Sequence, residues 1–359
     1  MGHRSLKTFA LLALALVASA QGVAEPFRLV RDLAYGSRAD APGEGASYVG
    51  KMVKDGAGHV CQTHRSGQFF DLLLPTPSGT APADAPVFVW LHGGAWCQRW
   101  DKDGDAYHLL RRFAARGFVV VSMDYILQND VLTNPSVPAR AQATWADMLR
   151  DVDALVSHLR AFLPTWGVRP KSFGIGGASA GAHLAALYAT DESDPAALAL
   201  GLRHELPVSF AVDVVGPVDL TLPSFRDPVL QVLRRARSAP DMFGRWTTLL
   251  ARLSGEDLAS ATSPAALEAV LRRWSPCAHV TSRTPPFILA YNRLHPFSSS
   301  DGLVPLACCD RMEAALSAAG VSCSTRVSWF QHHGQLRDGV QDWIVETAAK
   351  VANRGTCVR

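Results

Sequence analysis

The 359-residue sequence lacks three features: an uninterrupted stretch of 18 apolar residues beyond its N-terminal segment, a basic run longer than two residues, and a Cys-x-x-Cys pair. These absences exclude a further membrane-spanning helix, leave a nucleic-acid partner without support, and argue against a structural zinc site. Hydrophobic residues make up 48% of the chain and charged residues 19%, with a formal net charge of +3. This composition excludes the disordered and fibrous classes and predicts a globular protein.

The first twenty residues have the pattern of an export signal. Arg4 and Lys7 precede an apolar run at 9–17 that is too short to span a bilayer, and Ala-Ser-Ala follows it. We expect residues 1–20 to be removed, with a cut after Ala24 as the alternative. The same residues could instead form a buried N-terminal helix. The expected product is secreted or periplasmic and has no stable membrane anchor.

The seven cysteines fit an oxidising compartment, in which disulfides form. Their odd number leaves at least one thiol free. We expect Cys309 to pair with Cys323, because a helix followed by an adjacent strand would bring the two together. The full set is Cys61, Cys97, Cys277, Cys308, Cys309, Cys323 and Cys357.

Short apolar runs alternate with longer helical patterns along the chain. The strands are expected at 68–74, 87–91, 118–122, 172–176, 210–215, 286–291 and 321–330. The helices are expected at 105–115, 141–163, 180–190, 303–319 and 340–351. This alternation predicts an α/β fold with a mostly parallel sheet covered by helices on both faces.

We expect residues 21–359 to form a single domain, interrupted by a helical insertion at 219–275. Short helical stretches at 229–236, 247–253 and 264–273 break the alternation there. Such an insertion could form a cap over the carboxyl ends of the strands, where ligands bind, or pack at the periphery.

Gly177-Ala178-Ser179-Ala180-Gly181 lies between a predicted strand and a predicted helix. Small flanking residues permit a sharp turn, which presents the serine hydroxyl at the edge of the sheet above a helix N-terminus. The pattern alone also occurs in glycine-rich packing turns, so its strand–turn–helix setting carries the prediction. We predict that Ser179 is a nucleophile.

His92-Gly93-Gly94-Ala95-Trp96 follows the predicted strand that ends at Leu91. Two glycines let the backbone turn its amides inward without an intervening side chain. Such amides, together with the amide of Ala180, can bind the negative oxygen of a tetrahedral intermediate. The alternative is a tight loop that only closes the strand.

Asp301 and His333 each follow a predicted strand near the C-terminus. A serine hydroxyl is a poor nucleophile until a histidine takes its proton, and a carboxylate must orient that imidazole. The chain order Ser179, Asp301, His333 suits this architecture. His332 fits the spacing of the base as well, but we prefer His333 because it directly precedes a glycine.

Other aromatic and histidine residues have expected places outside the chemistry. His183 lies one helical turn after the serine, where we expect it to pack or to support the site, and His295 is expected to be an exposed loop residue. Trp96, Trp100 and the insertion could shape an acyl or alcohol pocket, although core packing explains a tryptophan at least as often.

Several motifs in order carry a resemblance to a known family. The chain resembles α/β-hydrolases of the hormone-sensitive-lipase-like carboxylesterases, nearest the bacterial feruloyl and acetyl-xylan esterases. It is also similar to the kynurenine formamidases, which share the His-Gly-Gly-x-Trp stretch. The resemblance covers about 68–345. Its motifs lie at 69–75, 92–96, 177–183, 215–220, 274–276, 301–305 and 333–334.

This resemblance implies an α/β-hydrolase fold with a catalytic triad, an oxyanion hole and no metal or organic cofactor. The implied roles are nucleophile for Ser179, base for His333, orienting acid for Asp301, and oxyanion donors for Gly94, Ala95 and Ala180. One departure concerns the acid, because the loop that precedes it is about five residues longer than in the family. Asp310, within the following helix, is the fallback.

We therefore expect an exported serine carboxylesterase that acts through an acyl-enzyme on Ser179. Its expected substrates are small-molecule or polysaccharide-linked esters with short acyl, aryl or acylated-sugar groups. One alternative is an arylformamidase-type amide hydrolase, which export disfavours. The other is a binding protein on a hydrolase fold that has lost catalysis, which the longer acid loop allows.

Overall fold

The computed structural model describes residues 26–37, 53–54, 60–61, 67–96, 105–127, 143–227, 250, 253–255, 264–295 and 297–354. The expected signal segment and its alternative cut lie outside these residues. Cys97, Trp100, Cys357 and the predicted helix at 229–236 also lie outside them, as does most of the one at 247–253.

One sheet organises the described part of the chain. Its strands, in spatial order, are β1 (Arg28–Ala34), β4 (Phe69–Leu74), β6 (Val119–Met123), β5 (Val87–Leu91), β7 (Phe173–Ala178), β8 (Phe210–Val214), β9 (Phe287–Arg293) and β10 (Cys323–Trp329). The strands from β6 to β10 pair in parallel, whereas β1 and β4 run antiparallel to their neighbours. A separate hairpin pairs β2 (Val53–Lys54) with β3 (Val60–Cys61). The prediction of a mostly parallel sheet is confirmed.

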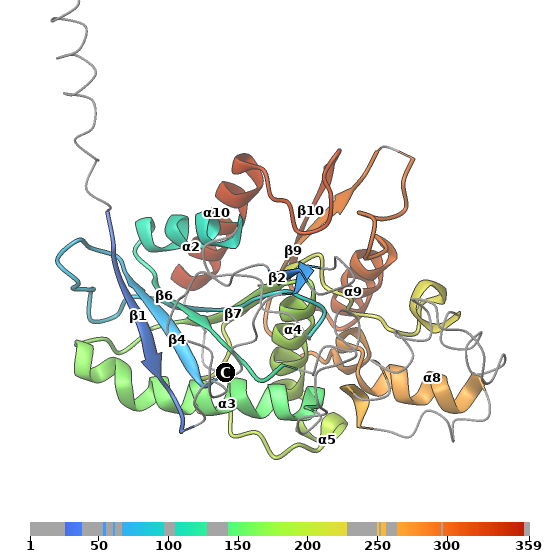
Figure 1. The fold of residues 1–359 in the computed structure, drawn as a ribbon, viewed down its shortest axis with the longest axis horizontal. Helices are drawn as coiled ribbons and strands as arrows, with labels where there is room; N and C mark the ends of the chain where they lie inside the picture. The colour runs from blue at the N-terminus through green and yellow to red at the C-terminus, as the bar shows by residue number, and fades with distance from the viewer. Residues whose placement is uncertain are drawn as a thin grey trace, which may run out of the picture.

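Helices cover both faces of this sheet (Figure 1). On one side, α2 (Asp105–Ala115) packs against α10 (Asp338–Asn353), and on the other α3 (Trp145–Phe162) packs against α4 (Ala180–Ser193). The remaining helical elements are η2 (Leu163–Trp166), α5 (Pro195–Leu198), α8 (Pro264–Arg273), η3 (Pro276–His279) and α9 (Ala307–Ala318). Because helices lie on both faces, the central strands are buried on both sides, and all five residues of β5 are buried.

Local sequence explains where several elements begin and pack. Helix α3 starts after Thr144, whose hydroxyl accepts from the Asp147 amide while the Asp147 carboxylate accepts from the Thr144 amide. At the core, the Phe88 ring stacks on Phe113 with centroids 4.1 Å apart and lies parallel to Phe210. These contacts tie strands β5 and β8 to helix α2.

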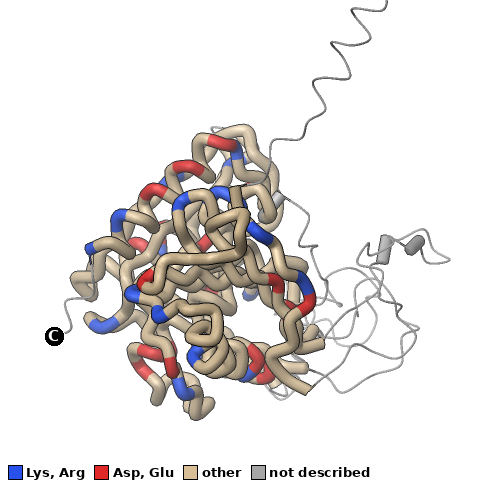
Figure 2. Tube along the Cα trace, turned by 90° about the vertical axis from the view of Figure 1, so that its left-hand side faces the viewer, with Lys and Arg blue, Asp and Glu red and all other residues tan. Residues whose placement is uncertain are grey.

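Charged residues of both signs are interspersed along the described trace (Figure 2). Salt bridges between surface side chains join α2 to α10, as between Arg112 and Asp338 at 2.7 Å. No described helix is long and apolar enough to cross a membrane.

The structure extends and corrects the elements expected from sequence. Strand β1 and the β2–β3 hairpin were not predicted, because Arg28–Ala34 shows no alternation of apolar and polar residues and the hairpin strands have two residues each. Helix α8 coincides with the expected 264–273 segment. The rest of the expected cap insertion, at 228–249, 251–252 and 256–263, lies outside the described residues.

The expected pairing of Cys309 with Cys323 is wrong, since both are free thiols. Cys309 is buried in the first turn of α9, whereas the Cys323 sulfur lies 3.6 Å from the Thr325 hydroxyl on β10. Burial raises the pKa of both thiols, that of Cys323 to about 11. Cys277 and Cys308 are free as well.

Candidate active site

Ser179 occupies a sharp turn between strand β7 and helix α4. Its backbone lies in the left-handed region with φ 52° and ψ −120°, a strained conformation for a residue with a side chain. The Ser179 amide donates to the Val214 carbonyl at 2.8 Å, which fixes the turn to strand β8. The side chain is partly exposed and makes no capping hydrogen bond to the helix below it. The hydroxyl is therefore presented at the carboxyl edge of the sheet, as the sequence predicts.

Two glycines permit this turn for a steric reason. A Cβ atom at Gly181 would lie 2.1 Å from the Leu91 carbonyl oxygen, and one at Gly177 would lie 2.4 Å from the Gly181 carbonyl carbon. Both distances are far below van der Waals contact. The serine turn thus packs directly on the end of β5, where the His92 turn begins.

The 92–96 turn lies beside the serine. A Cβ atom at Gly93 would lie 3.1 Å from the Ala178 carbonyl oxygen, so the two turns are in close contact. Gly94, Ala95 and Trp96 have φ values of 114°, 49° and 60°, all in the region that favours glycine. Three successive residues in this region turn the backbone sharply over the end of β5.

Tyr125 holds the beginning of the 92–96 turn, a role not foreseen from sequence. Its ring stacks on His92 with centroids 4.4 Å apart, and its hydroxyl donates to the His92 carbonyl at 2.8 Å. The signal in the sequence was weak, because Tyr125 follows the strand β6 without any motif of its own. The contact fixes the turn from the side of strand β6.

Asp301 and His333 come together although 32 positions separate them. His333 Nδ1 donates to Asp301 Oδ2 at 2.7 Å. The other oxygen, Asp301 Oδ1, accepts from the amides of Leu303 at 3.0 Å and Val304 at 2.9 Å. The carboxylate is buried and fully engaged, so it holds one orientation toward the imidazole.

The structure separates the two histidine candidates. The His332 side chain is exposed, whereas His333 makes the contact with Asp301. Asn292, at the end of β9, donates to the His332 and Gln335 carbonyls at 3.0 and 2.7 Å. Asn292 thereby fixes the loop that carries His333. Asn292 was missed in the sequence, where its only signal is a polar residue directly after the predicted strand at 286–291.

The remaining sequence candidates have other places. Asp310 is exposed on α9, and no hydrogen bond or ion pair joins it to His333 among the described residues. His295 is an exposed loop residue, as predicted. Trp96 is buried in the core with 3% of its surface exposed. His183 is fully buried, and burial lowers its pKa to about 4.

Beneath the site, Asp213 on β8 is buried against Tyr291 on β9. The Tyr291 hydroxyl lies 2.8 Å from Asp213 Oδ2 and 2.7 Å from the Gly216 carbonyl, and the Gly216 amide donates to Asp213 Oδ1. Burial raises the pKa of Asp213 to about 6, against the lowering effect of these hydrogen bonds. Among the described residues, no group of three or more His, Cys, Asp or Glu side chains has the arrangement of a metal site.

The arrangement can support nucleophilic acyl transfer. Ser179, Asp301 and His333 follow strands β7, β9 and β10, whose carboxyl ends lie at one edge of the sheet. This chemistry needs a hydroxyl, an oriented imidazole and backbone amides that bind an oxyanion; the first two are the Ser179 side chain and the His333–Asp301 pair.

Comparison with known proteins gives a match to one family. The family model described as BD-FAE matches residues 70–316. This range includes the 92–96 turn, the serine turn and Asp301, and it ends before His333.

Three curated proteins of Mycobacterium tuberculosis are similar to the chain. The probable carboxylic ester hydrolase LipM is 27% identical over 222 residues, 62% of this chain, and the esterase LipQ is 27% identical over 238 residues, 66% of this chain. The esterase LipC is 27% identical over 67% of this chain. The matched segment spans 42%, 47% and 49% of the lengths of LipM, LipQ and LipC, respectively.

Solved structures with similar folds are also esterases. An inhibited esterase B from Lactobacillus rhamnosis aligns over 97% of this chain and 95% of its own with a TM-score of 0.59 and 17% identity. A truncated carbohydrate esterase from gut microbiota aligns over 92% of this chain and 99% of its own, with a TM-score of 0.58 and 14% identity. At these identities the likeness concerns the fold, and it confirms the α/β-hydrolase architecture.

Proposed function

The chain belongs to the BD-FAE family and has an α/β-hydrolase fold, and on this premise we propose that it is a serine carboxylesterase that acts through an acyl-enzyme on Ser179. The observation that carries the proposal is the 2.7 Å hydrogen bond between His333 and Asp301 at the sheet edge that carries the serine turn. The names of the mycobacterial relatives support ester hydrolysis.

In the proposed first half-reaction, the Ser179 oxygen attacks the ester carbonyl carbon and its proton passes to His333 Nε2. Asp301 keeps Nδ1 protonated, so that Nε2 is free to accept, and stabilises the imidazolium. The carbonyl oxygen becomes an oxyanion that the amides of Gly94, Ala95 and Ala180 bind. His333 then gives its proton to the leaving alcohol, and the acyl group stays on the serine.

In the second half-reaction, water replaces the alcohol. His333 takes a proton from the water as its oxygen attacks the acyl carbonyl, and the same amides bind the new oxyanion. Collapse of this intermediate releases the carboxylic acid and returns the proton to the serine oxygen. The residues proposed for the two steps are the same.

For the substrate, we propose a carboxylic ester with an aryl or other apolar group, or an acylated sugar. Four large apolar side chains support the first choice, because they are exposed close in sequence to the acid and the base: Phe297, Leu303, Trp329 and Phe330. The carbohydrate esterase among the structural neighbours supports the second. The signal-like segment at 1–20 supports an extracellular substrate.

The test is labelling of the purified protein with a fluorophosphonate, followed by mass spectrometry, alongside hydrolysis of p-nitrophenyl acetate and butyrate. We expect a single adduct on Ser179 and turnover that Ser179→Ala removes. Turnover by a folded Ser179→Ala variant would refute the serine mechanism. A folded protein with neither adduct nor turnover would instead be a binding protein.

A second panel identifies the substrate class. Feruloyl esters, acetylated sugars and an aryl formamide are offered at equal concentration to the active protein. We expect the highest kcat/KM on one of the two ester classes. A higher kcat/KM on the formamide would assign the protein to amide hydrolysis.

A further inference from the structure

The 92–96 turn is strained, and something must hold it. Ala95 and Trp96 have positive φ values of 49° and 60°, which cost free energy for residues that carry a Cβ atom. A backbone keeps such a conformation only where the surrounding structure over-determines it. The contacts of Trp96 therefore hold the end of the turn that carries the amides of Gly94 and Ala95, as Tyr125 holds its beginning.

Trp96 is held in an aromatic cluster made of Trp96, Trp145, His183 and Trp274. Its ring meets His183 edge-to-face with centroids 5.2 Å apart, and it meets Trp145 at 5.4 Å. Trp145 in turn contacts His183 at 5.2 Å and Trp274 at 5.4 Å. All four side chains are at most 3% exposed, so these contacts are free of solvent.

His183 is the member of the cluster that belongs to the nucleophile helix. Its amide donates to the Ser179 carbonyl at 3.0 Å, and its ring Nε2 donates to the Trp274 carbonyl at 2.8 Å. The carbonyl can only accept, so the proton lies on Nε2. Burial disfavours a charge on this ring, so it stays neutral at ordinary pH. The His183 side chain thus links helix α4, the 92–96 turn and the segment at Trp274.

We propose that His183 is a positioning residue, which locks the Gly94–Trp96 turn to the helix that carries Ser179 and so aligns the oxyanion-binding amides from the two segments. Ala180 supplies its amide from helix α4, whereas Gly94 and Ala95 supply theirs from the turn. Without a fixed relation between these two segments, the donors would not converge on one oxygen. This role rests on the proposed esterase function.

The test compares two substitutions at this position. His183→Leu keeps a similar volume but removes the hydrogen bond and the aromatic edge, and His183→Gln places an amide donor near the position of Nε2. We expect His183→Leu to lower kcat about 10²-fold with KM nearly unchanged, because misplaced donors affect the transition state and not ground-state binding. His183→Gln should recover kcat to within about tenfold of the wild type.

His158 provides a matched control. Its ring contacts Phe70 and Phe162 at 5.8 and 5.2 Å, away from the serine turn. His158→Leu makes the same substitution at a partly buried histidine on helix α3, whose Nε2 has no hydrogen-bond partner among the described residues, and we expect kcat within about twofold of the wild type whatever the change in Tm. Equal kcat losses in His158→Leu and His183→Leu would reduce the effect to general destabilisation and overturn the role.

Two further readouts separate positioning from proton transfer. The near-UV circular dichroism of the tryptophans should change in His183→Leu and recover in His183→Gln, and the pH profile of kcat in His183→Gln should keep its midpoint. If His183→Leu does not fold, Trp145→Phe, which weakens the other support of Trp96, should lower kcat at constant KM.

The role is overturned by a folded His183→Leu variant with kcat within about twofold of the wild type, or by a rise in KM without a loss of kcat. A folded wild type without esterase turnover would instead refute the proposed function, and this role with it. The two failures are thus distinguishable.

Discussion

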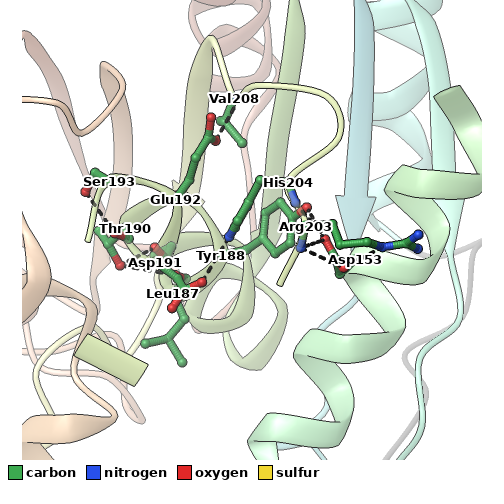
Figure 3. Close-up of polar contacts among 11 residues, drawn as sticks. Asp153, Leu187, Tyr188, Thr190, Asp191, Glu192, Ser193, Arg203, His204 and Val208 are labelled. Carbon is green, nitrogen blue, oxygen red and sulfur yellow. Dashed lines mark hydrogen bonds and ion pairs between the residues drawn. The ribbon is translucent and has the colours of Figure 1, made fainter. Parts of the chain in front are cut away.

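Helix α4 has a histidine–aspartate pair near each end, and the two pairs differ in what surrounds them. At its N-terminus, Ser179 lies at the sheet edge that also receives His333 and Asp301. Near its C-terminus, His204 Nε2 lies 2.9 Å from Asp191 Oδ2 (Figure 3). The distances are similar, so the pairing alone does not distinguish a site from a packing contact.

The surroundings of the far pair serve the fold. The His204 side chain is 8% exposed, against 17% for His333, and its Nδ1 is buried without a hydrogen-bond partner among the described residues. Asp153 Oδ1 accepts from the Tyr188 hydroxyl and the His204 amide, which ties α3 to the segment after α5. The nearby Ser193 hydroxyl donates to the Thr190 carbonyl.

A histidine–aspartate pair can therefore serve catalysis only where the second ring nitrogen is open to a nucleophile. At the serine end, His333 contacts Asp301 through Nδ1, and the turn that carries Ser179, the proposed nucleophile, lies at the same sheet edge. At the far end, both ring nitrogens are enclosed. Substitutions at the serine end should therefore lower kcat, whereas substitutions at the far end should lower the stability of the fold.

The largest expected effect on kcat comes from Ser179→Ala, and Ser193→Ala is its counterpart at the far end of α4. Ser179→Ala should lower kcat about 10⁶-fold with little change in Tm, because the hydroxyl makes no capping bond. Ser193→Ala removes a buried hydroxyl with hydrogen bonds, which should cost about 1 kcal/mol of unfolding free energy and leave kcat unchanged. Ester hydrolysis and thermal melts measure both. A loss of kcat in Ser193→Ala would remove the contrast between the ends.

The adjacent histidines give the next comparison. His333→Ala should lower kcat on the order of 10⁵-fold, because the proton of the serine then has no acceptor. His332→Ala should stay within about twofold of the wild type, since its side chain is exposed. Steady-state kinetics of the two variants measure this difference. Comparable small losses of kcat in both variants would refute the assignment of His333 as the base.

Substitutions of three aspartates give a smaller expected loss of kcat and test the same contrast. Asp301→Asn should lower kcat about 10⁴-fold by disturbing the imidazole tautomer. Asp191→Asn should lower Tm and keep kcat, whereas Asp310→Asn should change neither, because Asp310 is exposed. A larger loss of kcat in Asp310→Asn than in Asp301→Asn would move the acid to α9.

The last expected effect concerns how stability depends on pH, through Asp213 and His183. The pKa of Asp213 rises from 3.8 to about 6 on folding, so its stabilising contribution is present below pH 3.8 and lost as the pH rises through 6. The pKa of His183 falls from 6.5 to about 4, so its contribution is present above pH 6.5 and lost as the pH falls through 4. The two slopes oppose each other.

Asp213→Asn removes one of these slopes. The unfolding free energy of the variant should then rise more steeply with pH between pH 4 and 6 than that of the wild type. The difference in slope is up to about 1.4 kcal/mol per pH unit, and Tm should follow the same trend. Thermal melts across this range measure it. Parallel curves for the variant and the wild type would mean that Asp213 has the same pKa folded and unfolded.

Elements with a strong pattern could be predicted from sequence, and those that depend on distant partners could not. The run at Val87–Leu91 was predicted to the residue, because five consecutive apolar residues between turns form a strand buried on both faces. Strand β1 was missed, because its charged residues are compatible only with a strand at the edge of a sheet. It forms by pairing with β4, a contact that its own sequence does not reveal.

The same limit applies to the candidate site. The motifs around Ser179 and His92 have local spacing that the sequence displays, and Asp301 could be chosen over Asp310 from its place after a strand. Asn292 and Tyr125 act through contacts with residues far along the chain, at 40 and 33 positions. Spacing alone could not reveal such contacts, and it led to the wrong disulfide for Cys309.

The loop between strand β9 and Asp301 has a consequence for which insertions the protein tolerates. The segment that carries Asp301 has hydrogen bonds within itself. Ser300 forms a β-bridge with Pro305, the Leu306 amide donates to the Ser299 carbonyl at 2.7 Å, and the Asp301 carboxylate accepts from the amides of Leu303 and Val304. The Leu294 amide, directly after β9, donates to the Ser300 carbonyl at 3.1 Å and closes the loop between them, so the orientation of Asp301 depends little on the number of residues inside that loop. Insertions near His295 should therefore be tolerated, so that this loop is a place where new binding surface can evolve or be grafted without disturbing the reaction centre.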